Sequence, residues 1–438
     1  MSTSSSPVAP PRFGPRVIVT AAVVITSVVL AMIASYVFLR DPYWSLRWTV
    51  DLKVYLAAGQ TVRDGQSLYE LVVQSPLYGP MPYMYPPLTA ILFFVPLSFL
   101  PIGAASLVWN AISLMALGAV VWITLGIAGI RDSRAKVALT VVLLVLTAWL
   151  LPVRVQLIAG QINMFLLLLV LLDFRKPFGK WMGIGIGIAA GLKVTPLIFV
   201  GYLVFTRRWK AARTALLAFL GTVAVGFLIK PSDSATYWGG LVLHASRAGG
   251  VFDTPNQSMV GAMSRVLQTD VFAPWWFALL GLVAFYGLFV ATFAFRRGAD
   301  FLGFSAAAIT GLLVSPVSWE HHWVYVIPLM IWLAVWAYQK RAIGVALGTA
   351  VLAVVFTVRV FMIVGIQESP PRPMDLAVWQ QVIASLFPVT GLLLLLLGPL
   401  WVRRNFPPVK PAPDGSVPQQ IAIIPQARRS SEDREMVG

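Results

Sequence analysis

The chain has 438 residues, of which 58% are hydrophobic and 11% are charged, whereas a soluble domain carries about 25% charged residues. Its formal net charge is +16, but the Lys and Arg residues form short clusters between apolar runs, and no basic face is large enough to follow a nucleic-acid backbone. The chain has no cysteine, which excludes disulfides and thiolate metal sites.

Long apolar runs predict membrane-spanning helices. A helix crosses a hydrocarbon core about 30 Å thick with about 20 residues, and backbone groups in lipid must bond within the segment. The runs lack the strict alternation of a membrane β-barrel. We therefore expect an all-α, polytopic membrane helical bundle with about 11 to 13 transmembrane helices. The runs are, in chain order, 17–39, 88–100, 104–127, 135–151, 163–173, 181–205, 211–229, 272–295, 301–314, 323–338, 342–364 and 376–402.

The segments outside these runs define the expected domains. The tail 1–16 is rich in Ser and Pro, and we expect it in the cytoplasm before an uncleaved first helix. The membrane domain then covers 17–402, with a long first extracytoplasmic loop over 41–86. Within this loop, 51–64 has apolar residues at helical spacing among polar ones, which predicts an amphipathic helix at the membrane interface. The tail 403–438 is rich in Pro, Ser and Gln and should be disordered in the cytoplasm.

The basic clusters orient the bundle in a plasma membrane, because cytoplasmic loops carry an excess of Lys and Arg. One conflict follows: if 88–100 and 104–127 both span the membrane, the cluster that begins at Arg131 falls outside. We therefore expect 88–100 to be short or only partly inserted. The clusters are 131–136, 175–180, 207–213, 296–297, 340–341 and 403–404, and the loops left on the extracytoplasmic face are 40–85, 154–163, 230–270, 315–322 and 367–375.

The interfacial helix opens with a carboxylate. Asp51 precedes Tyr55 by four residues, so the two side chains share one helical face. A carboxylate at a membrane–water boundary can act as a general base toward a hydroxyl group. Asp is also favoured at helix N-caps, where it stabilises the helix by about 1 kcal/mol. The spacing alone leaves both roles open.

Lys193 lies inside the apolar run 181–205, which Lys193 and Pro196 interrupt. The run is therefore either one broken span or two half-length passes. A charge at the centre of a bilayer costs about 3 kcal/mol, so such a residue is a functional candidate, and a phosphate is its natural partner. The alternative is a lysine that extends its ammonium group to the nearest interface.

The densest polar cluster is 315–323, which contains Glu320, His321 and His322. Adjacent histidines on a helix point about 100° apart, and no second pair of ligands supports a metal site. We interpret one histidine as a partner of a phosphate or hydroxyl group, and a polar helix cap is the alternative.

Amides on an extracytoplasmic rim can bind sugar hydroxyls. The candidates are Gln161, Asn163, Asn256 and Gln257, with Arg265 as a cation close to the last two.

The sequence contains no Walker-type phosphate loop and no glycine-rich turn that opens a soluble nucleotide-binding fold. The glycines of 183–187 lie in an apolar helix and indicate helix packing. An activated substrate therefore has to reach the site through the membrane.

Several of these motifs follow one another in the order of a known family. From Asp51 to Tyr338 they resemble glycosyltransferase family 87 of the GT-C class, the polyprenyl-phosphate-mannose-dependent mannosyltransferases of actinobacteria. The motifs that carry the resemblance are Asp51 to Tyr55, Asp64-Gly65 with Leu68-Tyr69-Glu70, Tyr85-Pro-Pro-Leu88 with Pro96-Leu97 and Leu100-Pro101, Gly160-Gln161-Ile-Asn163, Lys193 with Pro196, Asn256-Gln257-Ser258, and Ser315-Pro316 through His322.

The resemblance implies an inverting α-1,2-mannosyltransferase that acts on the outer leaflet, with polyprenyl-phosphate mannose as donor and a mannosylated lipid, a phosphatidylinositol mannoside or lipomannan, as acceptor. Asp51 occupies the position of the family's catalytic aspartate. No metal is expected, because positive groups and hydrogen-bond donors can stabilise the leaving phosphate. Donor and phosphate contacts are expected from Lys193, His321, His322, Arg265 and Tyr55, and acceptor contacts from Gln161, Asn163, Asn256, Gln257 and Glu320.

A transporter or flippase of a lipid-linked sugar is the alternative function, because broken helices with a charge inside the membrane suit transport. Two features argue against it. The sequence shows no internal repeat, and a transporter does not need a long first loop with an amphipathic helix and a carboxylate.

Overall fold

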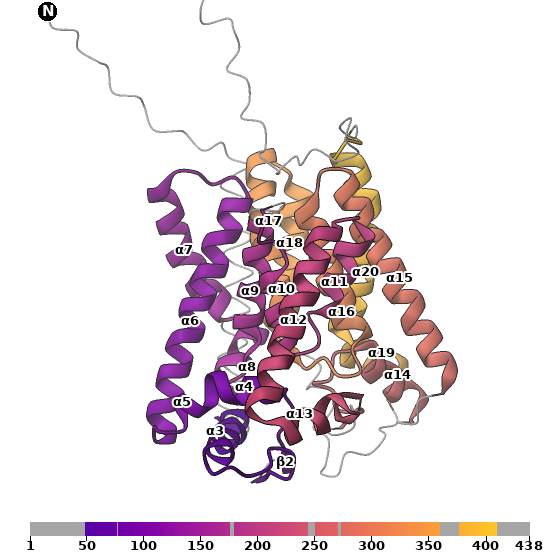
Figure 1. Cartoon of the computed structure of the whole chain (residues 1–438). Coiled ribbons are helices and arrows are strands. Elements are labelled where there is room, and N and C mark those ends of the chain that lie inside the picture. Colours follow the sequence, from indigo (N-terminus) through magenta and orange to yellow (C-terminus); the bar gives the residue numbers. More distant parts are fainter. Residues whose placement is uncertain are drawn as a thin grey trace, which may run out of the picture.

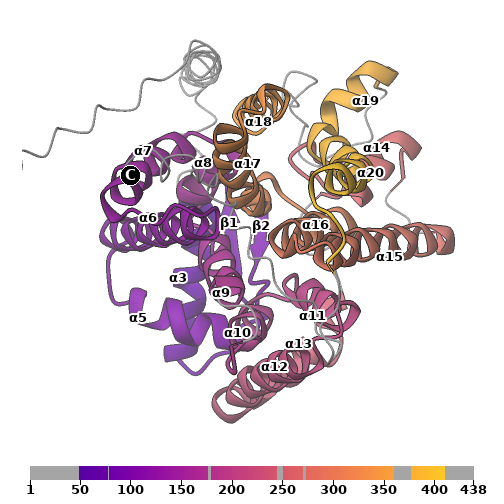
Figure 2. The same ribbon diagram turned by 90° about the horizontal axis from the view of Figure 1, so that it is seen from above.

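The computed structural model describes residues 49–76, 78–175, 179–243, 250–269, 273–359 and 376–409. Over these ranges the chain is a bundle of helices with one short antiparallel hairpin, in which Val72 pairs with Pro82 and Ser75 with Gly79. Figures 1 and 2 show the long helices side by side, and Figure 1 places the hairpin at the lower end of the bundle. The expected all-α architecture is confirmed.

The elements keep the order expected from the apolar runs. In chain order they are α3 (Val50–Arg63), β1 (Val72–Ser75), β2 (Gly79–Pro82), α4 (Pro87–Thr89), the π-helical turn η1 (Ala90–Phe94), α5 (Val95–Leu97), α6 (Ile102–Ile127), α7 (Ser133–Ala148), α8 (Leu151–Ala159), α9 (Asn163–Arg175), α10 (Ile184–Leu192), α11 (Leu197–Phe205), α12 (Trp209–Ile229), α13 (Pro231–Trp238), the 3-10 turn η2 (Leu241–Leu243), α14 (Met259–Leu267), α15 (Pro274–Arg296), α16 (Asp300–Val314), the 3-10 turn η4 (Glu320–Tyr325), α17 (Val326–Lys340), α18 (Ile343–Val355), α19 (Val378–Ala384) and α20 (Leu386–Asn405).

By length and composition, four helices of the described ranges could cross a membrane: α6, α12, α15 and α20. The bent pair α7 and α8, whose axes differ by 76°, would make a fifth span. Pro152 lies in the first turn of α8, where its missing N–H costs nothing, and it favours the start of a new helix. The other helices drawn along the bundle in Figure 1, such as α9, α16, α17 and α18, have 13 to 15 residues, so each spans only about 20 Å.

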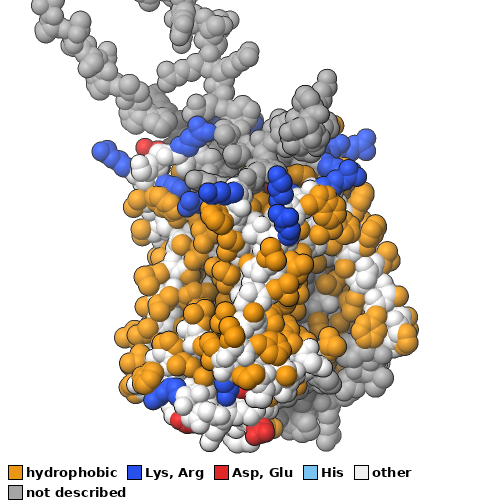
Figure 3. Space-filling model, in the orientation of Figure 1, with side chains coloured by type: hydrophobic (Ala, Val, Ile, Leu, Met, Phe, Trp, Pro, Cys, Tyr) orange, Lys and Arg blue, Asp and Glu red, His pale blue; other side chains and the backbone are white. Residues whose placement is uncertain are grey.

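The surface divides into an apolar belt and two polar ends. Figure 3 shows hydrophobic side chains around the middle of the bundle and a gathering of Lys and Arg side chains at its upper end. That end carries the start of α7 and α12 and the end of α15, α17 and α20, which are the positions of the basic clusters in the sequence. This separation of charge is the pattern that orients membrane proteins.

The segment 88–100 does not cross the bundle. It forms the apolar helix Pro87–Leu97, which is interrupted by the π-helical turn and lies at the lower end in Figure 1. Eleven residues span only about 17 Å, so α6 is the first described helix that returns to the basic end. The segment is short, as expected, and α6 leads to the end of the bundle that carries the cluster at Arg131.

The run 181–205 forms two half-length helices, α10 and α11. A Cβ atom placed on Gly183 would lie 2.2 Å from the Ala211 carbonyl oxygen, and one on Gly191 would lie 1.8 Å from Thr222 Oγ1. The axis of α10 therefore runs parallel to the first half of α12 and in close contact with it. Because α11 ends just before α12 begins, it returns to the same end of the bundle. Lys193 lies at the turn between the two half-helices.

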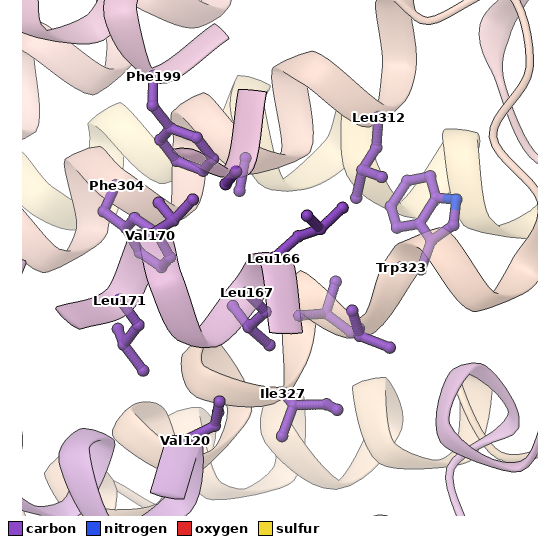
Figure 4. Close-up of a cluster of buried hydrophobic side chains, with 14 of the residues drawn as sticks. Val120, Leu166, Leu167, Val170, Leu171, Phe199, Phe304, Leu312, Trp323 and Ile327 are labelled. Atoms are coloured by element: carbon purple, nitrogen blue, oxygen red, sulfur yellow. The ribbon is translucent and has the colours of Figure 1, made fainter. Parts of the chain in front are cut away.

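Aromatic and aliphatic side chains fill the centre of the bundle (Figure 4). The ring centroids of Phe199 and Phe304 lie 5.3 Å apart in a stacked arrangement, and Val170, Leu312 and Trp323 close the same cluster. Lipid is as apolar as these side chains, so close packing of the helices, more than exclusion of water, stabilises such a core.

One predicted span is divided. The run 376–402 forms α19 and α20, which are separated at Ser385. The expected first helix 17–39, the tail 1–16, the loop 367–375 and most of the tail 403–438 lie outside the described residues.

Candidate active site

A tight connection between α8 and α9 builds the first half of the site. Gly160 ends α8 in a left-handed conformation, with φ +82°, which glycine adopts without a steric penalty. The indole N–H of Trp109 donates to the Gly160 carbonyl oxygen at 2.9 Å. A Cβ atom on Gly160 would lie 2.6 Å from Cβ of Leu52, so only glycine lets this turn pack against α3. The contact brings Gln161 next to Asp51.

Asp51 lies in the first turn of α3, and Thr49 occupies the N-cap position. The helix-cap alternative therefore does not describe Asp51, although a carboxylate in the first turn still interacts favourably with the helix dipole. Nε2 of Gln161 donates to Oδ2 of Asp51 at 2.7 Å. The carboxylate is partly buried and lies in the first loop, as expected.

Two tyrosines hold the other end of the Gln161 amide. The hydroxyl of Tyr55 donates to the hydroxyl of Tyr85 at 3.1 Å, and the hydroxyl of Tyr85 donates to Oε1 of Gln161 at 2.9 Å. Burial raises the pKa of both tyrosines, and the neighbouring Asp51 raises both further. Both hydroxyls are therefore neutral and able to donate. Tyr55, which was expected to contact the donor, belongs to this series of hydrogen bonds, and its ring stacks on that of Phe94.

Lys193 builds the second half of the site. It ends α10 in an extended conformation, and its Nζ donates to Oδ1 of Asn163 at 3.0 Å. The same Nζ lies 2.8 Å from Nε2 of His322 and 5.3 Å from the ring centroid of Tyr85. Tyr85 thus contacts both halves of the site, through its hydroxyl and through its ring.

Gln156 connects the two halves, and sequence analysis missed it. Its side chain is buried on α8. Nε2 of Gln156 donates to the carbonyl oxygen of Gln161, and Oε1 of Gln156 accepts from Nδ2 of Asn163 at 3.1 Å. An unbroken path of polar contacts therefore runs from Asp51 through these amides to Lys193. The available signal was a polar side chain inside the short apolar helix that precedes the Gly160 motif.

Glu320 and His321 lie beside this path on η4. Oε1 of Glu320 forms a buried ion pair with Nη2 of Arg359 at 3.0 Å, and the His321 ring lies 4.7 Å from that of His322. Nearby, Nη2 of Arg154 donates to the Thr357 carbonyl oxygen at 2.7 Å. Sequence analysis did not single out either arginine as a site residue, although each is a cation within or beside an apolar run.

Asn256, Gln257 and Arg265 form a separate polar cluster around α14 and α19. Arg265 donates to the carbonyl oxygens of Asp253, Asn256 and Ala384 and to Oγ of Ser385, at 3.0 to 3.2 Å. The side-chain amide of Gln257 donates to the carbonyl oxygens of Thr254 and Ala384. Arg265 and Gln257 therefore bind backbone carbonyl oxygens and the Ser385 hydroxyl.

This second cluster supports the loop that leads into η4. Oδ1 of Asn256 accepts from the Ser318 backbone N–H at 3.0 Å, and the Gln257 N–H donates to the Ser318 carbonyl oxygen at 2.7 Å. These contacts hold the backbone of the loop that directly precedes His321 and His322 in the chain. Direct contact of the three residues with donor or acceptor stays a prediction.

No group of three or more His, Cys, Asp or Glu side chains that could hold a metal ion occurs within the ranges that the structure describes. The expectation of a metal-independent reaction is left to experiment.

Comparisons with known proteins identify the family. The model of glycosyltransferase family 87 matches residues 83–316, just over half of the chain. No solved structure gives a significant match.

Two relatives from Mycobacterium tuberculosis are similar to this chain. The first, from strain CDC 1551 / Oshkosh, is a polyprenol-phosphate-mannose-dependent alpha-(1-2)-phosphatidylinositol pentamannoside mannosyltransferase, 35% identical over 288 residues that cover 65% of this chain and 66% of the relative. The second, from strain H37Rv, is the corresponding phosphatidylinositol mannoside mannosyltransferase, 30% identical over 364 residues that cover 79% of this chain and 83% of the relative. The chain therefore belongs to glycosyltransferase family 87 and is a glycosyltransferase.

Proposed function

We propose that the protein transfers mannose from polyprenyl-phosphate mannose to a phosphatidylinositol mannoside or to lipomannan, and forms an α-1,2 linkage. The names of the two mycobacterial relatives support the donor, the linkage and the class of acceptor. The observation that carries the proposal for this chain is the polar path that joins a carboxylate, Asp51, to a partly buried cation, Lys193. A transferase with a lipid-phosphate leaving group needs these two groups within one site.

Asp51 acts as the general base. It takes the proton from the 2-hydroxyl of the acceptor mannose as that oxygen attacks the anomeric carbon of the donor. The bond between the anomeric carbon and the phosphate oxygen breaks, and its electron pair leaves with the phosphate. Attack from the face opposite to the leaving group converts the β-linked donor into the α-linked product.

Lys193 and His322 receive the leaving phosphate. Negative charge on the phosphate oxygens increases as the glycosidic bond breaks, and preorganised positive groups and hydrogen-bond donors stabilise that charge in a site that excludes water. The ammonium group of Lys193, held by Asn163 and His322, is such a group. His321 lies beside His322 and is the second imidazole available to the phosphate.

The site opens toward the extracytoplasmic face in this proposal. The elements that carry Asp51 and the hairpin β1–β2 lie at the end of the bundle opposite to the gathered Lys and Arg side chains (Figures 1 and 3). The positive-inside bias assigns the basic end to the cytoplasm. Donor and acceptor would then both be lipids of the outer leaflet.

The test is a reconstituted transfer assay. Purified protein is incubated in detergent or liposomes with polyprenyl-phosphate mannose and a phosphatidylinositol mannoside, and the lipids are separated by mass. The expected product is larger by one hexose and is sensitive to an α-1,2-mannosidase. Movement of intact donor across the liposome membrane without an extended product would contradict the proposal and favour a flippase.

A further inference from the structure

The amide of Gln161 lies between the carboxylate of Asp51 and two buried tyrosines. Its Nε2 is 2.7 Å from Oδ2 of Asp51, and its Oε1 accepts from the Tyr85 hydroxyl at 2.9 Å. The Gln161 side chain is buried. Gln161 was expected to bind acceptor sugar, but both ends of its amide are engaged within the protein.

The carboxylate of Asp51 fixes which way the amide points, because an ionised carboxylate can only accept hydrogen bonds. If the Gln161 amide were turned over, its oxygen would face the Asp51 oxygen and two acceptors would oppose each other, so the orientation in which Nε2 donates to Asp51 is strongly preferred. The Tyr85 hydroxyl, which accepts from Tyr55, then donates to Oε1 of Gln161.

The backbone of Gln161 is held separately. Gln156 donates to the Gln161 carbonyl oxygen, and the Gly160 turn in front of it is held by Trp109 and packed on Leu52. The position of the Gln161 amide is therefore determined from both sides. A side chain held in this way can orient the group that it contacts.

We propose that Gln161 is a positioning residue that orients the carboxylate of Asp51 for proton transfer, with Tyr85 and Gln156 holding Gln161 in place. This inference rests on the proposed function, in which Asp51 is the general base. It replaces the sugar contact expected for Gln161. Proton transfer requires the base within hydrogen-bond reach of the hydroxyl in the right geometry, so a base that can rotate is a weaker catalyst.

The pH dependence of activity reports the charge state of Asp51. A purely structural role of Gln161 would leave that dependence unchanged. A hydrogen bond donated to the charged form of a carboxylate favours that form, and a second carboxylate nearby disfavours it. The base works when it is deprotonated, so activity falls on the acid side of the pH profile as Asp51 gains a proton. Removal of the donor should therefore shift this acid limb to higher pH.

The variants are Gln161→Leu, which removes the donor, and Gln161→Glu, which keeps the shape but introduces a second carboxyl group. We expect Gln161→Leu to lower kcat about 10-fold to 100-fold, the range for loss of a hydrogen bond to a charged group. The acid limb of kcat/KM should move up by about one pH unit in Gln161→Leu and further in Gln161→Glu. The KM for acceptor should stay within a factor of about two.

Gln60 and Asp64 give a matched control on α3. Nε2 of Gln60 lies 2.8 Å from Oδ1 of Asp64, which is the same kind of amide–carboxylate contact on an exposed part of the helix. The variant Gln60→Glu should leave kcat and the acid limb unchanged. If Gln161→Leu does not fold, Tyr85→Phe serves instead, because it leaves the amide and Asp51 in place and releases Oε1 of Gln161 together with the Tyr55 hydroxyl. We expect Tyr85→Phe to lower kcat about 3-fold to 10-fold with a shift of the acid limb in the same direction.

Three results would overturn the inference. An increase of acceptor KM by tenfold or more, with kcat and the acid limb unchanged, would make Gln161 a sugar ligand. An unmoved acid limb in both Gln161→Glu and Tyr85→Phe would show that the amide does not act through Asp51. If Asp51→Asn retains activity, the proposed function of Asp51 fails, and the role of Gln161 fails with it.

Discussion

The ammonium nitrogen of Lys193 lies 2.8 Å from Nε2 of His322, although 129 residues separate the two in the chain. An ammonium group only donates hydrogen bonds, so the imidazole must accept at this nitrogen and be neutral in that arrangement. The turn between α10 and α11 brings the lysine to η4, and Asn163 holds it from the other side. A phosphate that enters the site would meet a fixed positive group.

Lys193→Met should weaken the use of donor. The substitution keeps an unbranched side chain that is one atom shorter, but it removes the charge and the contacts with Asn163 and His322. We expect the donor KM to rise about 10-fold to 100-fold, or kcat to fall by a similar factor, because an interaction with the phosphate is lost in the ground state or in the transition state. The measurement is steady-state mannose transfer with varied donor.

The control for this prediction is Lys53→Met. Lys53 is exposed on α3, so its variant carries the same chemical change outside the polar path and should keep the kinetics of the parent. If Lys193→Met folds and its donor kinetics match those of Lys53→Met, Lys193 has no role in phosphate binding.

The local motifs of the site were predicted from sequence, and its assembly was not. Asp51, Lys193 and His322 stood out because each is polar in apolar or interfacial surroundings, and the break of the run 181–205 was visible at Lys193 and Pro196. Gln156 was missed because it falls in 154–163, which was interpreted as an extracytoplasmic loop, where a single glutamine is not unusual, whereas the structure continues the helix α8 to Ala159. Its role depends on contacts with Gln161 and Asn163, and those depend on the left-handed turn at Gly160.

The same limit explains the residues whose contacts differ from expectation. Arg265 and Gln257 lie in polar loops, where sequence cannot distinguish a ligand contact from a hydrogen bond to backbone. In the structure they bind carbonyl groups of residues about 120 positions later in the chain. Arg359 lies inside a run that was expected to form one helix to 364, but α18 ends at Val355 and Arg359 reaches Glu320.

The buried pair of Glu320 and Arg359 should contribute to stability. Their contacting atoms lie 3.0 Å apart, and the side chains are 1% and 5% exposed. Removal of one partner of a buried ion pair costs about 3–5 kcal/mol. We expect Glu320→Gln to lower the melting temperature in detergent, and the double variant with Arg359→Gln to lose less than the sum of the single changes. A raised acceptor KM in Glu320→Gln with an unchanged melting temperature would instead support the sugar contact expected from the sequence.

Labelling of single cysteines tests the orientation of the bundle, since the chain has no cysteine of its own. Glu70 and Ser232 are exposed at the end that carries the site, and Ser133 is exposed at the basic end. The variants Glu70→Cys and Ser232→Cys should react with an impermeant maleimide in intact cells. Ser133→Cys should react only after the membrane is opened. The reverse pattern would place the site in the cytoplasm.

Chelation tests the expectation that no metal is needed. Lys193 already supplies a positive group for the leaving phosphate, and Asn163 and His322 hold its ammonium nitrogen in place. We expect mannose transfer in excess EDTA to stay within a factor of about two of the untreated rate. Loss of transfer that returns on addition of a divalent cation would contradict this and would require a metal-bridged donor phosphate.

Asp51→Asn should abolish most of the turnover. The amide has nearly the shape of the carboxylate, and its oxygen can still accept from Nε2 of Gln161, but it cannot take a proton at neutral pH. Proton removal by a positioned carboxylate contributes about 10²–10⁴ in rate, and we expect kcat to fall by that factor. Equilibrium binding of radiolabelled donor should be retained, because the phosphate contacts lie at the other end of the polar path.

Asp64 and Glu70 are the nearby rival carboxylates. Both side chains are exposed. Gly65 has φ +72°, so Asp64 and Gly65 form the turn that ends α3. Asp64→Asn and Glu70→Gln should therefore keep the activity of the parent at matched protein levels. If Asp51→Asn keeps activity within a few-fold of the parent, Asp51 is not the base. The search would then move to Glu320, since that carboxylate lies on η4 directly before the two histidines.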